Sequence, residues 1–367
     1  MGNFRRSRLL CFFMPGEFDF IKQIQQKAAA QSAADLVLGI GDDAAIWREQ
    51  SGRESLVTVD LLVEDVDFKL EYASPRWLGH KTLAVSLSDI AAMGGAPKFS
   101  LLSLAIPQSA IRNPQFWEEF FAGYFELATK HGVTLIGGDI SSTPDRLAID
   151  SIVIGHCHVG KSIRRDGAKV GDAIYVTGSV GASAAGLTLL LGGERVGDDV
   201  RSSAFRRLKP QPPEGGTTNA IQSAIRAHLK PEPRVEFGRK LGELGLANSM
   251  IDVSDGLAQD LSHICEASGV GAVVDFEAVP IAEEVGLVMA NAEGAFEFAV
   301  SGGEDFELLF TADPANEMEL MALAERCQLR LTKIGEITER SLPVAVLTRR
   351  DSQVKPLSIR GYDHFGV

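Results

Sequence analysis

The sequence predicts an α+β fold made of two domains, each of which layers helices against a mixed sheet. A chain of 367 residues is too long for one average domain and suits two. Segments typical of strands and helices alternate in both halves, and no repeat of solenoid period is visible. The composition of the sequence changes near Gly160, so we expect domains at residues 16–160 and 161–367.

Composition excludes several classes of protein. A hydrophobic content of 45% and a charged content of 23% are typical of a globular protein in water. A net charge of −13 disfavours a surface for nucleic acid or anionic membranes, and a phosphate ligand would need metal ions to mask its charge. The four cysteines are far apart without CxxC spacing, so the sequence suggests neither a disulfide framework nor a zinc knuckle, and a reducing cytoplasm fits.

The N-terminus only partly resembles a targeting segment. Arg5, Arg6 and Arg8 precede a short apolar run, but this run is too short for a signal peptide and no small-residue cleavage site follows it. We expect residues 1–15 to be a disordered extension, with Met14 as a candidate natural start. No segment approaches the roughly 20 apolar residues of a membrane span.

Periodicity and helix-ending residues predict the elements of the N-terminal half. Phe18, Ile21 and Ile24 have helical spacing. Pro75 suits a first helical turn and Gly94 a helix end. The predicted helices are 17–30, 75–93 and 114–131, and the predicted strands are 36–38, 55–61, 100–106, 133–136 and 147–154.

The same patterns predict the C-terminal half. The strands are expected at 173–177, 250–253, 272–275 and 308–311, with closing strands near the C-terminus. Helices are expected at 182–191, 234–244, 257–268 and 316–327, with a further helical region before residue 308. Residues 192–218 are rich in Gly, Pro and Arg, which predicts a mobile insertion.

Two glycine motifs match nucleotide-binding patterns without their structural context. Residues 39–44 fit the dinucleotide pattern, but Asp42 and Asp43 would repel a diphosphate, and the residues that follow leave no room for the long helix. Residues 155–162 match the phosphate-loop pattern in full, including Lys161, yet the next segment runs into glycines and a strand. We expect His156, Cys157 and His158 to continue a strand rather than to bind a metal.

Acidic residues beside glycines recur where apolar runs end. Each acid alone suits a turn or a helix cap, as Asp255 would before the helix at Leu257 and Asp42 in its turn. Together they predict a site for hard cations, which bind carboxylates along with substrate phosphates. The set is Asp42, Asp43, Asp60, Asp89, Asp139, Asp252, Asp255, Glu304 and Asp305.

These residues stand in motifs that together resemble the thiamine-monophosphate kinase family. The motifs follow one another in order from about Gly16 to Phe365 and include Gly41–Ala44, Thr58–Glu64, Lys81–Gly94, Gly137–Asp139, Gly167–Asp172, Asp252–Leu257, Ser301–Leu308 and Gly361–Phe365. The wider superfamily contains aminoimidazole ribonucleotide synthetase, selenophosphate synthetase and a hydrogenase-maturation dehydratase. The sequence lacks the cysteines that the last two would need.

The resemblance implies two domains like those of aminoimidazole ribonucleotide synthetase, a cytoplasmic homodimer and a role in thiamine diphosphate biosynthesis. The implied magnesium ligands are Asp43, Thr58, Val59 (through its carbonyl), Asp60, Asp89, Asp139, Asp252 and Asp255. The implied ATP contacts are Gly138, Asp139, Arg165 and Ser254, and the implied substrate contacts are Asp67, Glu304 and Tyr362. The family often has His where Asp67 stands, and an aspartate there would repel a substrate phosphate.

The implied reaction is transfer of the ATP γ-phosphoryl group to thiamine monophosphate, with several magnesium ions. No residue is expected to act as a general acid or base, because the accepting phosphate is already anionic. Three alternatives stay open from the residues. They are a purine-pathway type of ATP-dependent synthetase, a non-catalytic scaffold that binds metal and nucleotide, and a phosphate-loop kinase that needs Lys161.

Overall fold

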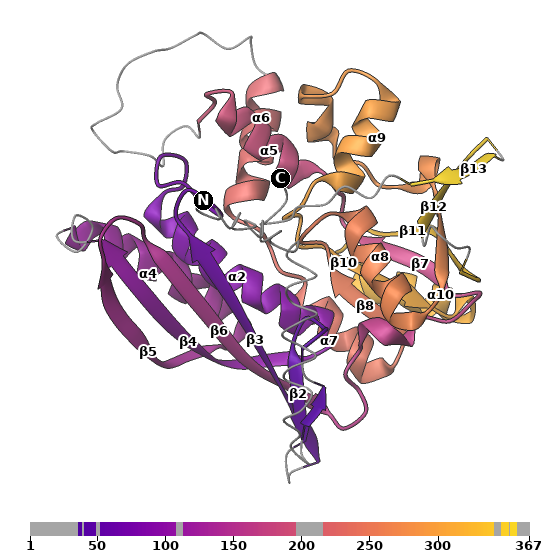
Figure 1. The fold of residues 1–367 in the computed structure, drawn as a ribbon, viewed down its shortest axis with the longest axis horizontal. Helices are drawn as coiled ribbons and strands as arrows, with labels where there is room; N and C mark the ends of the chain where they lie inside the picture. The colour runs from indigo at the N-terminus through magenta and orange to yellow at the C-terminus, as the bar shows by residue number, and fades with distance from the viewer. Residues whose placement is uncertain are drawn as a thin grey trace, which may run out of the picture.

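In a computed structural model of the chain, the described residues are 36–38, 40–48, 52–107, 113–195, 216–340, 346–351 and 353–357. They form two sheets with helices packed around them (Figure 1). This arrangement confirms the predicted α+β class. The predicted extension 1–15, the helix predicted at 17–30 and most of the predicted insertion lie outside the described residues.

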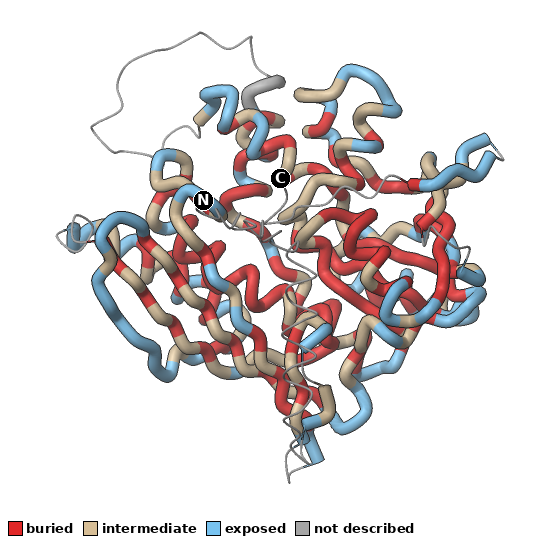
Figure 2. The backbone as a smooth tube through the Cα atoms, viewed as in Figure 1, coloured by how far each residue is buried: buried red, intermediate tan, exposed pale blue. Residues whose placement is uncertain are grey.

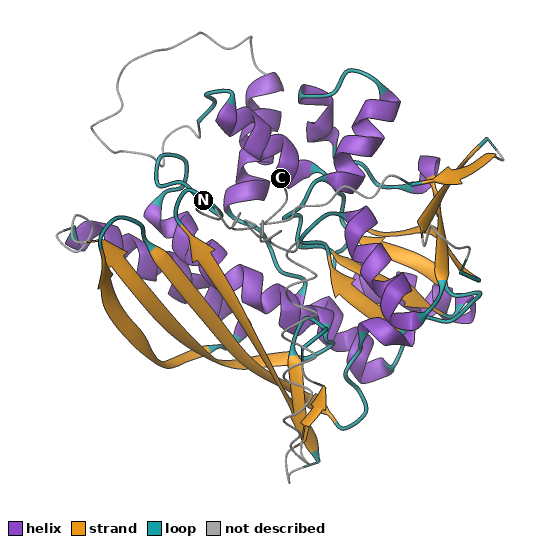
Figure 3. Ribbon diagram, in the orientation of Figure 1, coloured by secondary structure: helices purple, strands orange, loops and turns teal. Residues whose placement is uncertain are grey.

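The first sheet has six strands in the order β1-β2-β3-β6-β4-β5. Its neighbours are antiparallel except β4 and β5, which are parallel because helix α4 connects them. Helices α2 and α4 cover one face, and no described helix covers the other (Figure 3). The strands are β1 (Leu36–Leu38), β2 (Ala45–Arg48), β3 (Arg53–Val63), β4 (Ala96–Pro107), β5 (Thr134–Thr143) and β6 (Ala148–His158).

Helix α2 (Pro75–Ala92) is buried on nearly every side, between the first sheet and both α4 (Pro114–His131) and α7 (Val235–Leu244). Glycines allow α2 and α4 to touch through their backbones. A Cβ atom on Gly79 would lie 1.9 Å from the carbonyl oxygen of Phe120, and one on Gly123 would lie 1.8 Å from that of Arg76. Because α2 is fixed on all sides, the polar side chains it carries have fixed positions.

The second sheet has seven strands in the order β13-β12-β9-β11-β7-β10-β8, antiparallel except for the β9–β12 pair. Its strands are β7 (Ala173–Thr177), β8 (Ser249–Asp252), β9 (Gly271–Asp275), β10 (Leu308–Ala312), β11 (Leu331–Thr338), β12 (Val346–Arg350) and β13 (Gln353–Pro356). The other α-helices are α5 (Ala182–Leu191), α6 (Gly216–Leu229), α8 (Leu257–Ser268), α9 (Ala292–Ser301) and α10 (Glu317–Arg326). Four short 3₁₀ helices are η1 (Arg165–Gly167), η2 (Phe276–Ala278), η3 (Glu283–Leu287) and η4 (Pro314–Asn316).

Most predicted elements are confirmed, but two acids do not end strands as expected. Asp60 lies inside β3, and Gly137, Gly138 and Asp139 lie inside β5. Gly138 allows β5 to continue beside β4, since a Cβ atom there would lie 1.9 Å from the carbonyl oxygen of Leu102. The predicted boundary near Gly160 falls between β6 and β7, and α7 from the C-terminal half packs against β4 and β6.

The described helices and cysteines bear on the predicted cellular environment. None of these helices is long and apolar enough to cross a membrane. Cys157, Cys265 and Cys327 are free thiols, and Cys157 and Cys265 are buried. Cys11 lies outside the described residues.

Candidate functional site

Three carboxylates from distant parts of the chain meet where the two sheets approach each other. Asp43 follows β1, Asp89 lies on α2, and Asp252 ends β8. One oxygen of each carboxylate lies within 4.8 Å of the others. The structure therefore brings together three of the predicted metal ligands.

Buried hydroxyl groups hold Asp89, Asp252 and the neighbouring Asp60. The Ser86 hydroxyl donates to Asp60 Oδ2 over 2.7 Å, and the Ser88 hydroxyl, two residues along α2, donates to Asp252 Oδ2 over 2.6 Å. The predicted ligand Thr58, on β3, donates its hydroxyl to Asp89. Since α2 is buried, its serines fix one acid from the first sheet and one from the second.

Burial, together with the charges of neighbouring acids, raises the pKa of Asp60, Asp89 and Asp252. Burial, followed by the charge of Asp43, raises the pKa of Asp252 to about 8. Burial raises the pKa of Asp60 to about 6, and burial together with Asp60 raises the pKa of Asp89 well above its ordinary range. Carboxylates held this close repel one another, and a divalent cation with oxygen ligands relieves that repulsion. The donor set therefore fits Mg²⁺.

Arg165 and Asp42 complete this edge of the site. The Arg165 guanidinium pairs with Asp43, and its Nε lies 3.5 Å from Asp42 Oδ1. Asp42 accepts hydrogen bonds from the backbone N–H of Asp43 over 2.9 Å and of Arg165 over 3.0 Å. Asp42 therefore has the turn role predicted for it. Arg165 lies where it could neutralise an anion bound beside Asp43.

Asp255 does not cap α8, so that alternative interpretation was wrong. The residue before the helix is Gly256, whose lack of a side chain leaves no cap, and Asp260 Oδ2 instead accepts from the Asp255 and Gly256 N–H groups over 3.3 and 3.1 Å. Asp255, Asp260 and His263 form a second group with the spacing of metal ligands. Asp255 accepts a hydrogen bond from Gln259 Nε2 over 3.4 Å and also lines the cavity described next.

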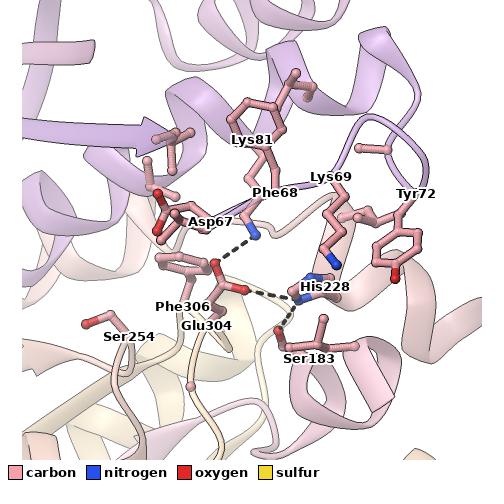
Figure 4. Close-up of a pocket in the computed structure, with 18 of the residues that line it drawn as sticks. Asp67, Phe68, Lys69, Tyr72, Lys81, Ser183, His228, Ser254, Glu304 and Phe306 are labelled. Atoms are coloured by element: carbon pink, nitrogen blue, oxygen red, sulfur yellow. Dashed lines mark hydrogen bonds and ion pairs between the residues drawn. The ribbon is translucent and has the colours of Figure 1, made fainter. Parts of the chain in front are cut away.

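A cavity of about 370 Å³ adjoins the acid cluster (Figure 4). One end carries predicted metal and ATP residues, namely Asp60, Ser254 and Asp255. Glu304 lines the same cavity beside His228 (Figure 4). Much of the remaining wall is apolar, with Leu62, Val66, Phe68, Leu78, Val85, Leu187 and Phe306. A ligand with a ring system and an anionic end would fit this distribution of side chains.

Side chains from three helices, α2, α5 and α6, surround the Glu304 carboxylate. Glu304 Oε1 lies 2.7 Å from Lys81 Nζ of α2, and Oε2 lies 3.1 Å from His228 Nδ1 of α6. The Ser183 hydroxyl of α5 lies 3.1 Å from the same histidine nitrogen (Figure 4). Although burial opposes ionisation, Lys81 and then His228 lower the pKa of Glu304 to about 2. Glu304 is therefore anionic throughout the neutral range.

Asp67 lines the same cavity and also closes the turn after β3. Asp67 Oδ2 accepts a hydrogen bond from the Val63 N–H over 2.7 Å. Lys69 and Tyr72 follow at the cavity wall, and Lys69 Nζ lies 5.6 Å from the centre of the Tyr72 ring. The hydrogen bond from the Val63 N–H gives a physical reason for an aspartate at position 67, while the role of Asp67 as a substrate contact stays a prediction.

Gly138 and Asp139 lie apart from the other predicted ligands of the same chain. Asp139 pairs with Ser103, Ser103 with Asp150, and Asp150 with Leu61, so Asp139 lies three strand spacings, or about 14 Å, from β3. These paired residues share the face that no described helix covers. The Val59 side chain lies on that face too, and Tyr362 lies outside the described residues.

The structure agrees with the rejection of both glycine motifs. Strand β2, not a helix, follows Asp42 and Asp43. Strand β6 continues to His158, as predicted, and Lys161 leads only to the three-residue helix η1. Cys157 is buried, while His156 and His158 are more exposed, as alternation along a strand requires.

Sequence reasoning missed the residues that surround Glu304 and one buried acid. Lys81 is only 2% exposed, although lysine is rarely buried, and its position in an apolar helix gave no sign of an ion pair. His228 lies near the end of α6 beside the predicted insertion. Asp260 follows Asp255 at the spacing of one helical turn plus one residue, which could have singled it out.

Comparisons with known proteins show the family of the chain. Residues 41–157 match the family described as AIR synthase related protein, N-terminal domain, and residues 169–347 match its C-terminal domain. The thiamine-monophosphate kinase of Bacillus subtilis (strain 168) is 40% identical over 357 residues, covering 95% of this chain and 99% of the relative. That of Escherichia coli (strain K12) is 35% identical over 352 residues, covering 96% and 99%.

Two solved structures are similar over nearly the whole chain. The thiamine-monophosphate kinase from Stenotrophomonas maltophilia K279a is 34% identical with a TM-score of 0.71, covering 92% of this chain and 97% of that one. AaThiL complexed with AMPPCP and TMP is 29% identical with a TM-score of 0.75, covering 95% and 97%.

Proposed function

The chain belongs to the thiamine-monophosphate kinase family of AIR synthase related proteins, and from that membership we propose that it phosphorylates thiamine monophosphate with ATP. The products are thiamine diphosphate and ADP. One observation carries the proposal for this chain: Asp60, beside the carboxylate cluster of Asp43, Asp89 and Asp252, lines a cavity that an anionic Glu304 also lines.

We assign the metal site to the carboxylates and their neighbours. Asp43, Asp60, Asp89, Asp252 and Asp255, with Thr58 and the Val59 carbonyl, would hold magnesium ions. When bound, these ions neutralise the negative charge of the phosphates. The raised pKa values of Asp60, Asp89 and Asp252 support the assignment, since such a cluster favours a cation over its own ionised, unpaired state.

The remaining residues position the two substrates for direct in-line transfer. Arg165 and Ser254 would hold the ATP phosphates beside the cluster, and Glu304 would hold the cationic heterocycle in the cavity. The accepting phosphate is a nucleophile without losing a proton, so the protein contributes alignment and charge rather than a general base. For this reason we expect no histidine or serine to act as a catalytic base.

We also infer that the protein works as a homodimer. The uncovered face of the first sheet exposes apolar side chains, with Val59 and Leu61 each about 60% exposed. Patches of this kind mark interfaces, and β5 beside it is exposed along most of its length (Figure 2). Packing two such faces would cover the patch and carry Gly138 and Asp139 toward the partner's site, which explains why they lie apart from the cluster in one chain.

Light scattering tests the dimer. Wild-type protein should have about twice the chain mass of 39.4 kDa, and Leu61→Glu, which places a charge on the patch, should shift it to the monomer. Met318→Glu, at a side chain that is 85% exposed on α10, is the matched control and should stay dimeric. A monomeric wild type would refute the dimer without touching the assignment of the reaction.

Substrate comparison separates the proposed reaction from its rivals. With saturating magnesium, thiamine monophosphate should trigger ADP release and formylglycinamidine ribonucleotide should not. The reverse result would favour a purine-pathway type of synthetase, and nucleotide binding without turnover would favour a scaffold. Loss of thiamine diphosphate formation in Asp43→Ala is also expected, and an unchanged rate in that variant would contradict the assigned metal site.

A further inference from the structure

Glu304 is paired with two buried side chains rather than standing alone in the cavity. Each of its oxygens has its own partner, with Lys81 Nζ at 2.7 Å and His228 Nδ1 at 3.1 Å. Lys81 and His228 are 2% and 5% exposed, and both line the cavity (Figure 4). Since a carboxylate only accepts hydrogen bonds, His228 Nδ1 must carry the proton that faces Glu304.

The backbone around Glu304 is equally constrained. Glu304 has a φ of +64°, which is costly for a residue with a side chain. Its N–H donates to the Ser254 carbonyl over 2.7 Å, and Asp305 accepts from the N–H groups of Gly181 and Ser183 over 2.6 and 3.1 Å. These bonds tie the loop to the ATP end of the site and to α5, so the Glu304 carboxylate has little freedom.

We propose that Lys81 and His228 are positioning residues for substrate recognition, which hold Glu304 ionised and oriented toward the cationic heterocycle of thiamine monophosphate. The proposal deepens the proposed function and rests on it. A half-buried carboxylate in a largely apolar cavity takes up a proton more readily when it has no partners. Lys81 prevents this, and His228 fixes the second oxygen, so the carboxylate presents its remaining lone pairs to the ligand.

The other charged groups near Glu304 do not replace Lys81. From the remaining elements that pack around the cavity, the titratable and charged side chains among the described residues are Asp60 of β3, Asp67, Lys69 and Tyr72 after β3, Asp255 before α8, and the adjacent Asp305. Four of these six are carboxylic acids, whose charges oppose ionisation of Glu304. Lys81 and His228 are therefore the groups whose removal should leave Glu304 protonated near neutral pH.

The test compares Lys81→Met, His228→Leu and Glu304→Gln by calorimetric binding of thiamine monophosphate and by KM and kcat between pH 5.5 and 8.5. Each variant should bind thiamine monophosphate about 10- to 100-fold more weakly, the loss of one hydrogen bond to a charged group, with a smaller change in kcat. In Lys81→Met the ratio of its KM to the wild-type KM should rise as the pH falls. In Glu304→Gln, which has no carboxylate to titrate, that ratio should be independent of pH.

A double variant and two controls exclude a merely structural role. Adding Lys81→Met to Glu304→Gln should weaken binding little further, because Lys81 acts through Glu304. His228→Asn, which keeps a donor near Nδ1, should recover binding that His228→Leu loses. Arg234→Met breaks another ion pair, in which Arg234 Nε lies 2.7 Å from Glu307 Oε2. This variant should lower stability without a pH-dependent KM ratio.

The outcomes separate this proposal from the reaction itself. Fully additive effects of Lys81→Met and Glu304→Gln, a KM ratio that does not change with pH, or equal behaviour of Arg234→Met would overturn the positioning role. Failure of wild-type protein to bind thiamine monophosphate would overturn it too. If wild-type protein binds thiamine monophosphate but forms no thiamine diphosphate, the proposed reaction fails while the binding arms still decide the role of Lys81 and His228.

Discussion

Asp43→Asn should reduce kcat/KM for ATP and thiamine monophosphate about 10²- to 10³-fold. The change keeps the shape of the side chain and removes one charge from a cluster whose oxygens lie within 4.8 Å of one another. Two unit charges about 4 Å apart at an effective dielectric constant near 20 interact by roughly 4 kcal/mol, which corresponds to about 10³ in rate. Relief of the repulsion from Asp89 and Asp252 offsets part of this loss.

The assay measures thiamine diphosphate formation over a range of magnesium concentrations. Asp43→Asn should need more magnesium for half-maximal activity, and high magnesium should restore part of the rate. Asp42→Asn is the matched control, because burial and the neighbouring Asp43 raise the pKa of Asp42 to about 7, so it carries only part of a charge at neutral pH. Retention of more than a tenth of wild-type activity by Asp43→Asn, or equal losses in both variants, would refute the role of Asp43.

Three further predictions concern other parts of the molecule. Lys161→Ala should keep wild-type turnover, since no helix follows Lys161 to form a phosphate loop, and a large loss would revive that alternative. Burial lowers the pKa of His131 to about 4, so the free energy of unfolding should be highest above pH 6.5 and should fall as the pH drops toward 4, where the unfolded state binds the proton first. The free energy of unfolding of His131→Gln should depend less on pH between about 4 and 6.5, and an identical dependence would contradict this. Gly123→Ala should lower the free energy of unfolding by about 1–3 kcal/mol, because its Cβ would lie 1.8 Å from the Arg76 carbonyl oxygen. The control Gly286→Ala has open space around it and should leave the thermal unfolding temperature almost unchanged.

The fold and half of the site could be predicted because their determinants are local. Pro75 and the glycines after Met93 bound a helix in the sequence itself, and α2 has those bounds in the structure. Carboxylates beside glycines at the ends of apolar runs predicted a cation site, and Asp43, Asp89 and Asp252 do converge. These predictions need only the periodicity and chemistry of neighbouring residues.

What could not be predicted depends on contacts between distant segments. The pairing of Lys81 with Glu304 joins α2 to a loop more than 200 residues later, and no local pattern in either segment indicates it. Asp139 was grouped with the other acids because it follows glycines, yet the parallel pairing of β4 and β5 places it on the uncovered face. No local pattern in the sequence indicates that pairing.

Transfer of a labelled phosphoryl group tests the central claim most directly. Purified protein with magnesium, thiamine monophosphate and ATP labelled in the γ-phosphate should place the label in the terminal phosphate of thiamine diphosphate, in equal amount to the ADP formed and without labelled protein. Label released as inorganic phosphate, or ADP formed without thiamine diphosphate, would contradict the claim that this chain transfers the group directly between the two phosphates.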